Sequence, residues 1–447
     1  MKRSRKRFSS RSPARKSPRS RVRSRGEAAS TRKKRAVHGK MTVGKKRAQK
    51  RAKASGTIRK RRAVVASGAK PAAGRVHAPR IARLSAGSMA TALTSAGVPG
   101  QTLLIPGTQA TCLEDAGGTV VYNAVRVSLG LDRDSLGGRP PEQWIRLLSM
   151  RHDPGRLDPV ATSLEPGTRL STGKVVHTPY NRLETFVHDF PYDWRGDLRF
   201  SAARLLQYLS DHRPANGGRW NLIGHSQGGL LIVLASKLTA SPEDFSRLVA
   251  RIVLVGAPLA GTMQATRALL TGRDDLGPGM QQAARDIGRT WPSLYQMLPS
   301  WSAVLDENGH AVPGEQQLTQ PGGWPNQVGI QEDLLLRARQ TQALLTGPFA
   351  HVGPGTATLA IFGEKQDTPV TIVRDAGGLQ PATMRNEAGD SLVPCERTLQ
   401  WGGSPFANHS VVFDGNVNPH AMLCEDEDVV SEIQRFLAAP APPAPVP

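Results

Sequence analysis

A single serine stands in a Gly-x-Ser-x-Gly pattern at the junction of two apolar runs. The stretch is NLIGHSQGGLLIVLAS, residues 221–236, and it places Ser226 between Gly224 and Gly228. Between a strand and a helix this pattern is typical of a nucleophile elbow, a strained turn that exposes the serine hydroxyl above a sheet. Glycines are needed on both sides because a Cβ there would strike the neighbouring strand or helix. The stretch therefore predicts nucleophilic catalysis by Ser226.

A serine hydroxyl is a weak nucleophile and needs a histidine that is itself held by a carboxylate. After a nucleophile elbow, the acid is expected before the histidine in the chain. Asp390 lies in a turn, GDSLVP, residues 389–394, and is the favoured acid. Asp367 follows the predicted strand 356–363 and is the alternative.

Three histidines that follow the elbow are candidates for the base. His420 directly precedes the last predicted helix and is favoured. His409 begins an apolar segment, SVVF, where a packed or solvent-facing strand residue is the simpler interpretation, and His351 is the third candidate. His225 adjoins the serine, but we expect it to point away from the serine and to be structural.

Two backbone N–H groups are predicted to bind the oxyanion that forms on the substrate. The N–H of Gln227 lies at the start of the helix that follows Ser226, where N–H groups are free and the dipole favours negative charge. The second donor should come from the loop after an earlier strand, and Thr108 in LLIPGTQAT, residues 103–111, is our candidate. The alternative is that Pro106-Gly107 forms an ordinary turn.

The segments around these residues alternate between strand and helix patterns. Uniformly apolar strands are expected at 101–107, 185–190, 220–224, 251–258 and 356–363, and helices at 199–212, 228–238 and about 427–438. Such strands alternating with helices predict an α/β fold with a mostly parallel, doubly wound sheet covered on both faces.

Two long segments interrupt the alternation, and the two ends of the chain differ from the body. Residues 113–183 are rich in Gly, Pro and Arg, and residues 262–355 carry helical patterns that predict a cap or lid. The predicted hydrolase domain is therefore 96–438, with a disordered basic tail at 1–85 and a Pro-rich disordered end at 439–447.

The charge of the chain is concentrated in the tail. Residues 1–80 hold 30 Lys and Arg against one acid, Glu27, whereas the remainder holds 29 basic and 35 acidic residues. The tail is expected to stay solvated or to bind anions or nucleic acid non-specifically, unless translation starts at Met41 or Met89. No signal peptide or membrane span is recognisable, which predicts a cytoplasmic location. The three cysteines, Cys112, Cys395 and Cys424, do not indicate a disulfide-stapled fold.

Seven segments together resemble the lecithin:cholesterol acyltransferase-like family of α/β-hydrolases, and the resemblance spans about residues 100–438. In chain order these are IPGTQAT (105–111), FPYDWR (190–195), GHSQGG (224–229), GAPLAGT (256–262), WPSLYQMLP (291–299), GDSLVP (389–394) and H-x-x-L-x-x-D-x-x-V from His420. The resemblance implies Ser226 as nucleophile, Asp390 as acid, His420 as base, and Thr108 and Gln227 as oxyanion donors. The family's acid motif usually reads GDGTVP; here Ser391 and Leu392 replace Gly and Thr while the carboxylate is kept.

The resemblance implies a lipase, esterase or O-acyltransferase that forms an acyl-enzyme from an ester lipid and passes the acyl group to water or an alcohol. No metal or organic cofactor is needed for this chemistry, and contact with a lipid surface is expected. Two alternatives stay open. One is an amidase or thioesterase with the same triad; the other is a non-catalytic hydrolase-like body tethered to nucleic acid or membrane by the basic tail.

Overall fold

The chain divides into two units, Met1–Gly74 and Arg75–Pro447. The computed structural model describes residues 81–84, 102–123, 140–153, 155–157, 170–272, 279–326, 329–346, 355–399, 409–413 and 420–445, all in the second unit. The expected disordered tail, 1–85, lies outside the described residues except for 81–84. Those four residues form a strand, Ile81–Leu84, that joins the central sheet.

The core of the second unit is a seven-stranded sheet in which every pair of neighbours is parallel. Its order is β1 (Ile81–Leu84), β13 (His409–Phe413), β10 (Ala357–Gly363), β8 (Val249–Val255), β7 (Trp220–His225), β2 (Thr102–Ile105) and β6 (His188–Asp189). Crossover connections put helices on the faces of such a sheet, which explains why strands β7 and β8 are buried along their whole length. The predicted α/β-hydrolase fold is confirmed.

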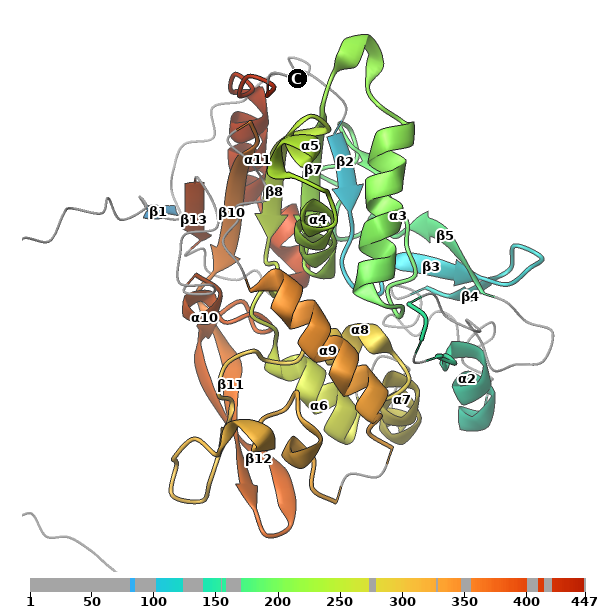
Figure 1. The fold of residues 1–447 in the computed structure, drawn as a ribbon, viewed down its shortest axis with the longest axis vertical. Helices are drawn as coiled ribbons and strands as arrows, with labels where there is room; N and C mark the ends of the chain where they lie inside the picture. The colour runs from blue at the N-terminus through green and yellow to red at the C-terminus, as the bar shows by residue number, and fades with distance from the viewer. Residues whose placement is uncertain are drawn as a thin grey trace, which may run out of the picture. The chain divides into compact units, whose positions relative to one another are not determined.

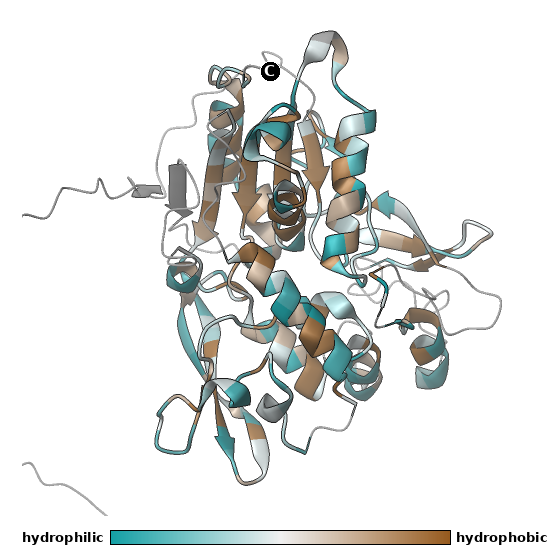
Figure 2. Ribbon diagram, viewed as in Figure 1, coloured by the Kyte–Doolittle hydropathy of each residue, from teal (hydrophilic) through white to brown (hydrophobic). Residues whose placement is uncertain are grey.

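Successive residues of the central strands belong to two separate hydrophobic clusters. Leu222 packs with helices α3 (Leu198–Asp211) and α4 (Gln227–Lys237), whereas Ile223 packs with helix α11 (Glu427–Ala438). Because strand side chains alternate between faces, α3 and α4 cover one face and α11 covers the other (Figure 1). Figure 2 shows the same layering: the strands are apolar, and the helices that cover them carry polar residues on their outer faces.

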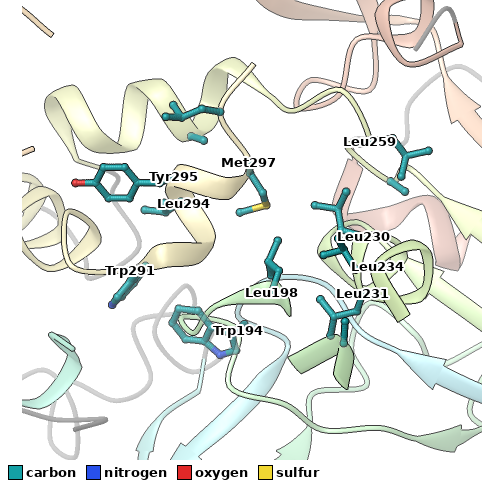
Figure 3. Packing of buried hydrophobic residues seen from close by; sticks show 14 of the residues in the cluster. Trp194, Leu198, Leu230, Leu231, Leu234, Leu259, Trp291, Leu294, Tyr295 and Met297 are labelled. Carbon is teal, nitrogen blue, oxygen red and sulfur yellow. The ribbon is translucent and has the colours of Figure 1, made fainter. Parts of the chain in front are cut away.

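The predicted cap segment, 262–355, lies at the carboxyl ends of the central strands (Figure 1). Its elements are α6 (Met263–Thr271), α7 (Gln281–Gly288), α8 (Pro292–Gln296), β9 (Val304–Leu305), η3 (Gly314–Gln316), η4 (Pro321–Gly323) and α9 (Glu332–Leu345). Cap and core pack through apolar side chains, as Figure 3 shows for Leu294 and Met297 opposite Leu198 and Leu230. Trp194 and Trp291 meet edge to face, with ring centroids 5.0 Å apart.

A buried carboxylate also ties the cap to the sheet. Asp197 caps helix α3 and is paired with Arg199, at 2.8 Å, and with Arg337 of α9, at 3.3 Å. The side-chain amide of Gln296 in α8 donates to the same carboxylate at 2.8 Å. Burial raises the pKa of Asp197, but the hydrogen bonds and charge of Arg199 outweigh it, so the pKa of this carboxyl lies below its usual value. The ionised aspartate therefore joins elements from both sides of the cap boundary.

Several elements were not predicted from the strand–helix alternation. Two small sheets have the orders β12-β11-β9 and β4-β3-β5. The remaining elements are β3 (Thr111–Glu114), β4 (Val120–Tyr122), α2 (Pro141–Leu148), β5 (Ser171–Val175), η1 (Ala215–Gly217), α5 (Pro242–Ser246), β11 (Gln366–Asp375), β12 (Gly378–Gly389), α10 (Cys395–Leu399) and η7 (His420–Glu425).

Two arginines contact the described part of the Pro-rich end, 439–445, which was expected to be disordered. Arg251 donates to the carbonyl of Ala439, and Arg219 donates to that of Pro442. All three cysteines are buried. Among the described helices, none combines the length and apolar character needed to span a membrane.

Candidate active site

Ser226 occupies the strained turn that joins strand β7 to helix α4. Its backbone has φ 52° and ψ −124°, a conformation that residues other than glycine rarely adopt. A Cβ on Gly228 would lie 2.0 Å from the carbonyl oxygen of Ile105, and one on Gly224 would lie 2.7 Å from the Cα of Gly229. Both flanking glycines are therefore required by close backbone approach, as the sequence pattern predicts.

Asp390 and His420 form a buried pair beside the elbow. Oδ2 of Asp390 lies 2.8 Å from Nδ1 of His420, and the side chains are 1% and 5% exposed. The other oxygen, Oδ1, accepts from the backbone N–H groups of Leu392, at 3.0 Å, and Val393, at 2.7 Å. A carboxylate with both oxygens bound in this way fixes the imidazole and keeps its proton on Nδ1, leaving Nε2 as the basic atom.

The alternative acid and bases are placed elsewhere or lie outside the described residues. Asp367 is exposed on strand β11, where it pairs with Ala388. The backbone of His409 begins strand β13. His351 lies outside the described residues.

Ser226 and His420 line one cavity of about 260 Å³. Within the described part of the chain, no group hydrogen-bonds to the buried Nε2 of His420. The geometry thus brings together the predicted nucleophile, base and acid, although the three residues are far apart in the sequence.

The two predicted oxyanion donors flank the serine. Thr108, in the loop after β2, lines the same cavity. A Cβ on the preceding Gly107 would lie 3.1 Å from the Cβ of Ser226, so this loop runs close to the elbow. The side chain of Gln227 bonds to Tyr192 and to the carbonyl of Trp194, while its backbone N–H stands in the first turn of α4, where helical N–H groups have no intrahelical acceptor.

His225 is held by hydrogen bonds at both ring nitrogens. Nδ1 lies 2.9 Å from the hydroxyl of Tyr180, and Nε2 lies 3.0 Å from the carbonyl oxygen of His420. Burial, with a contribution from His420, lowers the pKa of His225 to about 3, so its ring is neutral. A structural role for this histidine was expected, but Tyr180 was missed, because a lone tyrosine in a loop gives no pattern to recognise.

The cavity walls are mainly apolar and come from both core and cap. Leu294 and Met297 belong to the cap, and Val176, Pro258 and Val393 to loops around the sheet. No Asp, Glu, Lys or Arg is among the lining residues within the described ranges. Such a site suits an uncharged chain better than a charged group.

Comparison with known families gives one match. The family model described as lecithin:cholesterol acyltransferase matches residues 173–331, about a third of the chain. This confirms the resemblance over the segment that holds Ser226 and most of the cap, whereas Asp390 and His420 lie beyond it. With the fold, the match indicates a hydrolase or acyltransferase. No curated protein matches.

Several solved structures are similar in fold. A chain of the Tle4–Tli4 complex is 12% identical, with 76% of this chain and 98% of that chain covered and a TM-score of 0.46. The mature lipase BlEst2 of Bacillus licheniformis is 11% identical, with 76% and 91% covered and a TM-score of 0.30. The lin2722 product of Listeria innocua is 13% identical, with 76% and 94% covered and a TM-score of 0.29.

Proposed function

We propose that this α/β-hydrolase is a serine-dependent lipase, esterase or O-acyltransferase in which Ser226, His420 and Asp390 are the triad. One observation carries the proposal. The imidazole of His420 is fixed by Asp390 through Nδ1, its Nε2 is buried without a partner among the described residues, and His420 and Ser226 line the same cavity. An imidazole held in this way can accept the proton of a serine hydroxyl.

In the proposed reaction, Nε2 of His420 takes the proton of Ser226 as Oγ attacks the ester carbonyl. The carbonyl π electrons move to oxygen, and the N–H groups of Thr108 and Gln227 stabilise the resulting oxyanion. As the carbonyl re-forms, the bond to the alcohol oxygen breaks, and His420 returns its proton to that oxygen. Water or a second alcohol then attacks the acyl-enzyme by the same steps, which frees Ser226.

The cavity favours the acyl chain of a neutral ester or lipid as its occupant. Apolar side chains dominate its walls and no fixed charge lines it within the described residues, so a charged head group would have to stay outside. Its volume of about 260 Å³ accommodates a short or medium chain better than a whole lipid.

Turnover of p-nitrophenyl esters from acetate to dodecanoate by the full chain tests the proposal. Ser226→Ala should lower kcat by about 10⁴-fold or more. The matched control is Ser236→Ala, which removes another buried hydroxyl from helix α4, one that donates to the carbonyl of Val233. Equal rates in the wild type and Ser226→Ala would reject the assignment. Added alcohols that give new esters would show acyl transfer.

The same panel separates the alternative activities. Faster cleavage of acyl-thioesters or amides would place the triad in a thioesterase or amidase. Absence of any turnover, together with DNA or anionic-vesicle binding that falls steeply with salt and is lost without residues 1–85, would favour a tethered non-catalytic body.

A further inference from the structure

We propose that Tyr180 and His225 are positioning residues that join the oxyanion loop to the base. This inference rests on the proposed function, because it concerns how the loop at Gly107 and Thr108 and the ring of His420 are held relative to one another. Three hydrogen bonds carry it: Gly107 to Tyr180, Tyr180 to His225, and His225 to His420.

The bridge runs through the interior without a break. The N–H of Gly107 donates to the Tyr180 hydroxyl at 2.9 Å, and that hydroxyl lies 2.9 Å from Nδ1 of His225. Nε2 of His225 then lies 3.0 Å from the carbonyl oxygen of His420. Tyr180 is 0% exposed and His225 is 4% exposed, so water does not compete freely for these bonds.

The two ends of the bridge fix the direction of every hydrogen bond. A backbone N–H can only donate, and a carbonyl oxygen can only accept. Nε2 of His225 must therefore carry the proton, Nδ1 is an acceptor, and the Tyr180 hydroxyl donates to it. This arrangement requires a neutral imidazole, and burial lowers the pKa of His225 far enough to supply one.

The bridge controls groups that the proposed mechanism uses. The N–H of Gly107 is committed to Tyr180, which holds in place the loop whose next residue, Thr108, lines the cavity. At the other end, the N–H of His420 donates to the carbonyl of Asp390 at 2.9 Å while its carbonyl accepts from His225. The backbone of the base is thus held on both sides, and its ring is held by Asp390.

Two variants remove the hydrogen bond between Tyr180 and His225, one from each side. Tyr180→Phe keeps the ring but deletes the hydroxyl, and His225→Gln keeps a side-chain amide that can donate to His420 but has no ring Nδ1. Each should lower kcat for p-nitrophenyl butanoate by about 10- to 100-fold with little change in KM, as expected for loss of positioning. The kcat of the double variant should be about that of the poorer single variant, because both substitutions remove the same hydrogen bond between Tyr180 and residue 225.

Tyr295→Phe is the matched control, because it removes an equally buried hydroxyl that donates to the carbonyl of Arg289 in the cap. It should lower the thermal midpoint as much as Tyr180→Phe while leaving kcat near the wild-type value. Affinity for butylboronic acid, whose serine adduct is tetrahedral, should fall in Tyr180→Phe and stay unchanged in the control. An unchanged kcat and boronate affinity in Tyr180→Phe would overturn the positioning role.

Amide hydrogen exchange separates this inference from the proposed function. In Tyr180→Phe, exchange should rise in the peptide that contains Gly107 and in the one that contains His420. If the wild type turned over no ester, the proposed function would fail, and faster exchange in these two peptides would still support the bridge. Unchanged exchange in both peptides would overturn it.

Discussion

Asp390 holds His420 by side chain and by backbone at once. Its Oδ2 lies 2.8 Å from Nδ1 of the imidazole, and its carbonyl oxygen accepts the N–H of His420 at 2.9 Å. The pair also leaves little room, since a Cβ on Gly256 would lie 3.1 Å from Oδ2 of Asp390 and from the ring of His420. The imidazole of His420, the proposed base, is therefore held in one position.

Replacing Asp390 by Asn should lower kcat by about 10⁴-fold, because an amide can stabilise neither the required tautomer nor the imidazolium that forms. Asp367→Asn is the matched control, since Asp367 is exposed on β11 and should leave kcat within about twofold of the wild type. Steady-state kinetics with one ester decide between them. A large loss in Asp367→Asn with normal rates in Asp390→Asn would reverse the assignment of the acid.

Gly228→Ala should destabilise the protein, because the added Cβ would lie 2.0 Å from the carbonyl oxygen of Ile105. We expect the free energy of unfolding to fall by about 1–3 kcal/mol or more, measured by denaturant titration. Gly314→Ala serves as the control, since a Cβ there meets nothing within 4 Å. Equal stability of the two variants would show that the elbow has more room than the structure allows.

His225 should contribute to the pH dependence of stability. Its pKa is about 3 in the folded chain, against the ordinary histidine pKa of 6.5, so the unfolded chain binds more protons between these values. The stabilisation is complete above about pH 6.5 and is lost as the pH falls towards 3, by up to about 1.4 kcal/mol per pH unit. The groups that face this ring are Tyr180, His420 and Asp390.

Urea titrations of wild type and His225→Gln, from about pH 7 to about pH 4, check this prediction. The free energy of unfolding should fall more steeply with decreasing pH in the wild type than in the variant. His152, whose pKa is also lowered by burial, is present in both chains and cancels in the difference. Parallel curves would contradict a neutral His225.

Ala265 should influence the length of acyl chain that the enzyme accepts. It lies in α6, is 2% exposed and lines the cavity, so Ala265→Leu should fill part of that space. Each methylene excluded from the cavity is expected to lower kcat/KM by roughly fourfold. The preferred p-nitrophenyl ester should therefore become shorter. Ala343→Leu, at an exposed site on α9, is the control and should leave the chain-length profile unchanged. An unchanged profile in Ala265→Leu, or a shifted profile in Ala343→Leu, would argue against this cavity as the acyl site.

The sequence was most informative where local chemistry sets local structure. Uniformly apolar strands such as 251–258 and the glycines around Ser226 predict the parallel sheet and the turn, because each leaves a recognisable pattern within a short stretch of sequence. Asp390 and His420 were favoured over Asp367 and His409 by their places in a turn and before the last helix, and the family resemblance implied the same two residues. Their pairing depends on where distant loops meet.

The features that escaped prediction depend on tertiary contacts. In the β11–β12 hairpin, burial alternates only over part of β11 and follows no regular pattern along β12, so the sequence does not mark the pair clearly. The role of Tyr180 can be recognised only in the folded chain, where the loop after β5 brings its hydroxyl to Gly107 and His225. The hydrogen bonds from Arg219 and Arg251 to carbonyl groups of the Pro-rich end likewise cannot be read from its composition.

Labelling with a fluorophosphonate, followed by peptide mapping, tests the central claim most directly, because only a serine activated by a neighbouring base reacts quickly with this probe. We expect one modified residue, Ser226, and a labelling rate at least about 10³-fold lower in His420→Ala. His409→Ala should label at the wild-type rate. Labelling at another serine, or rapid labelling of Ser226 in the absence of the His420 imidazole, would contradict the account.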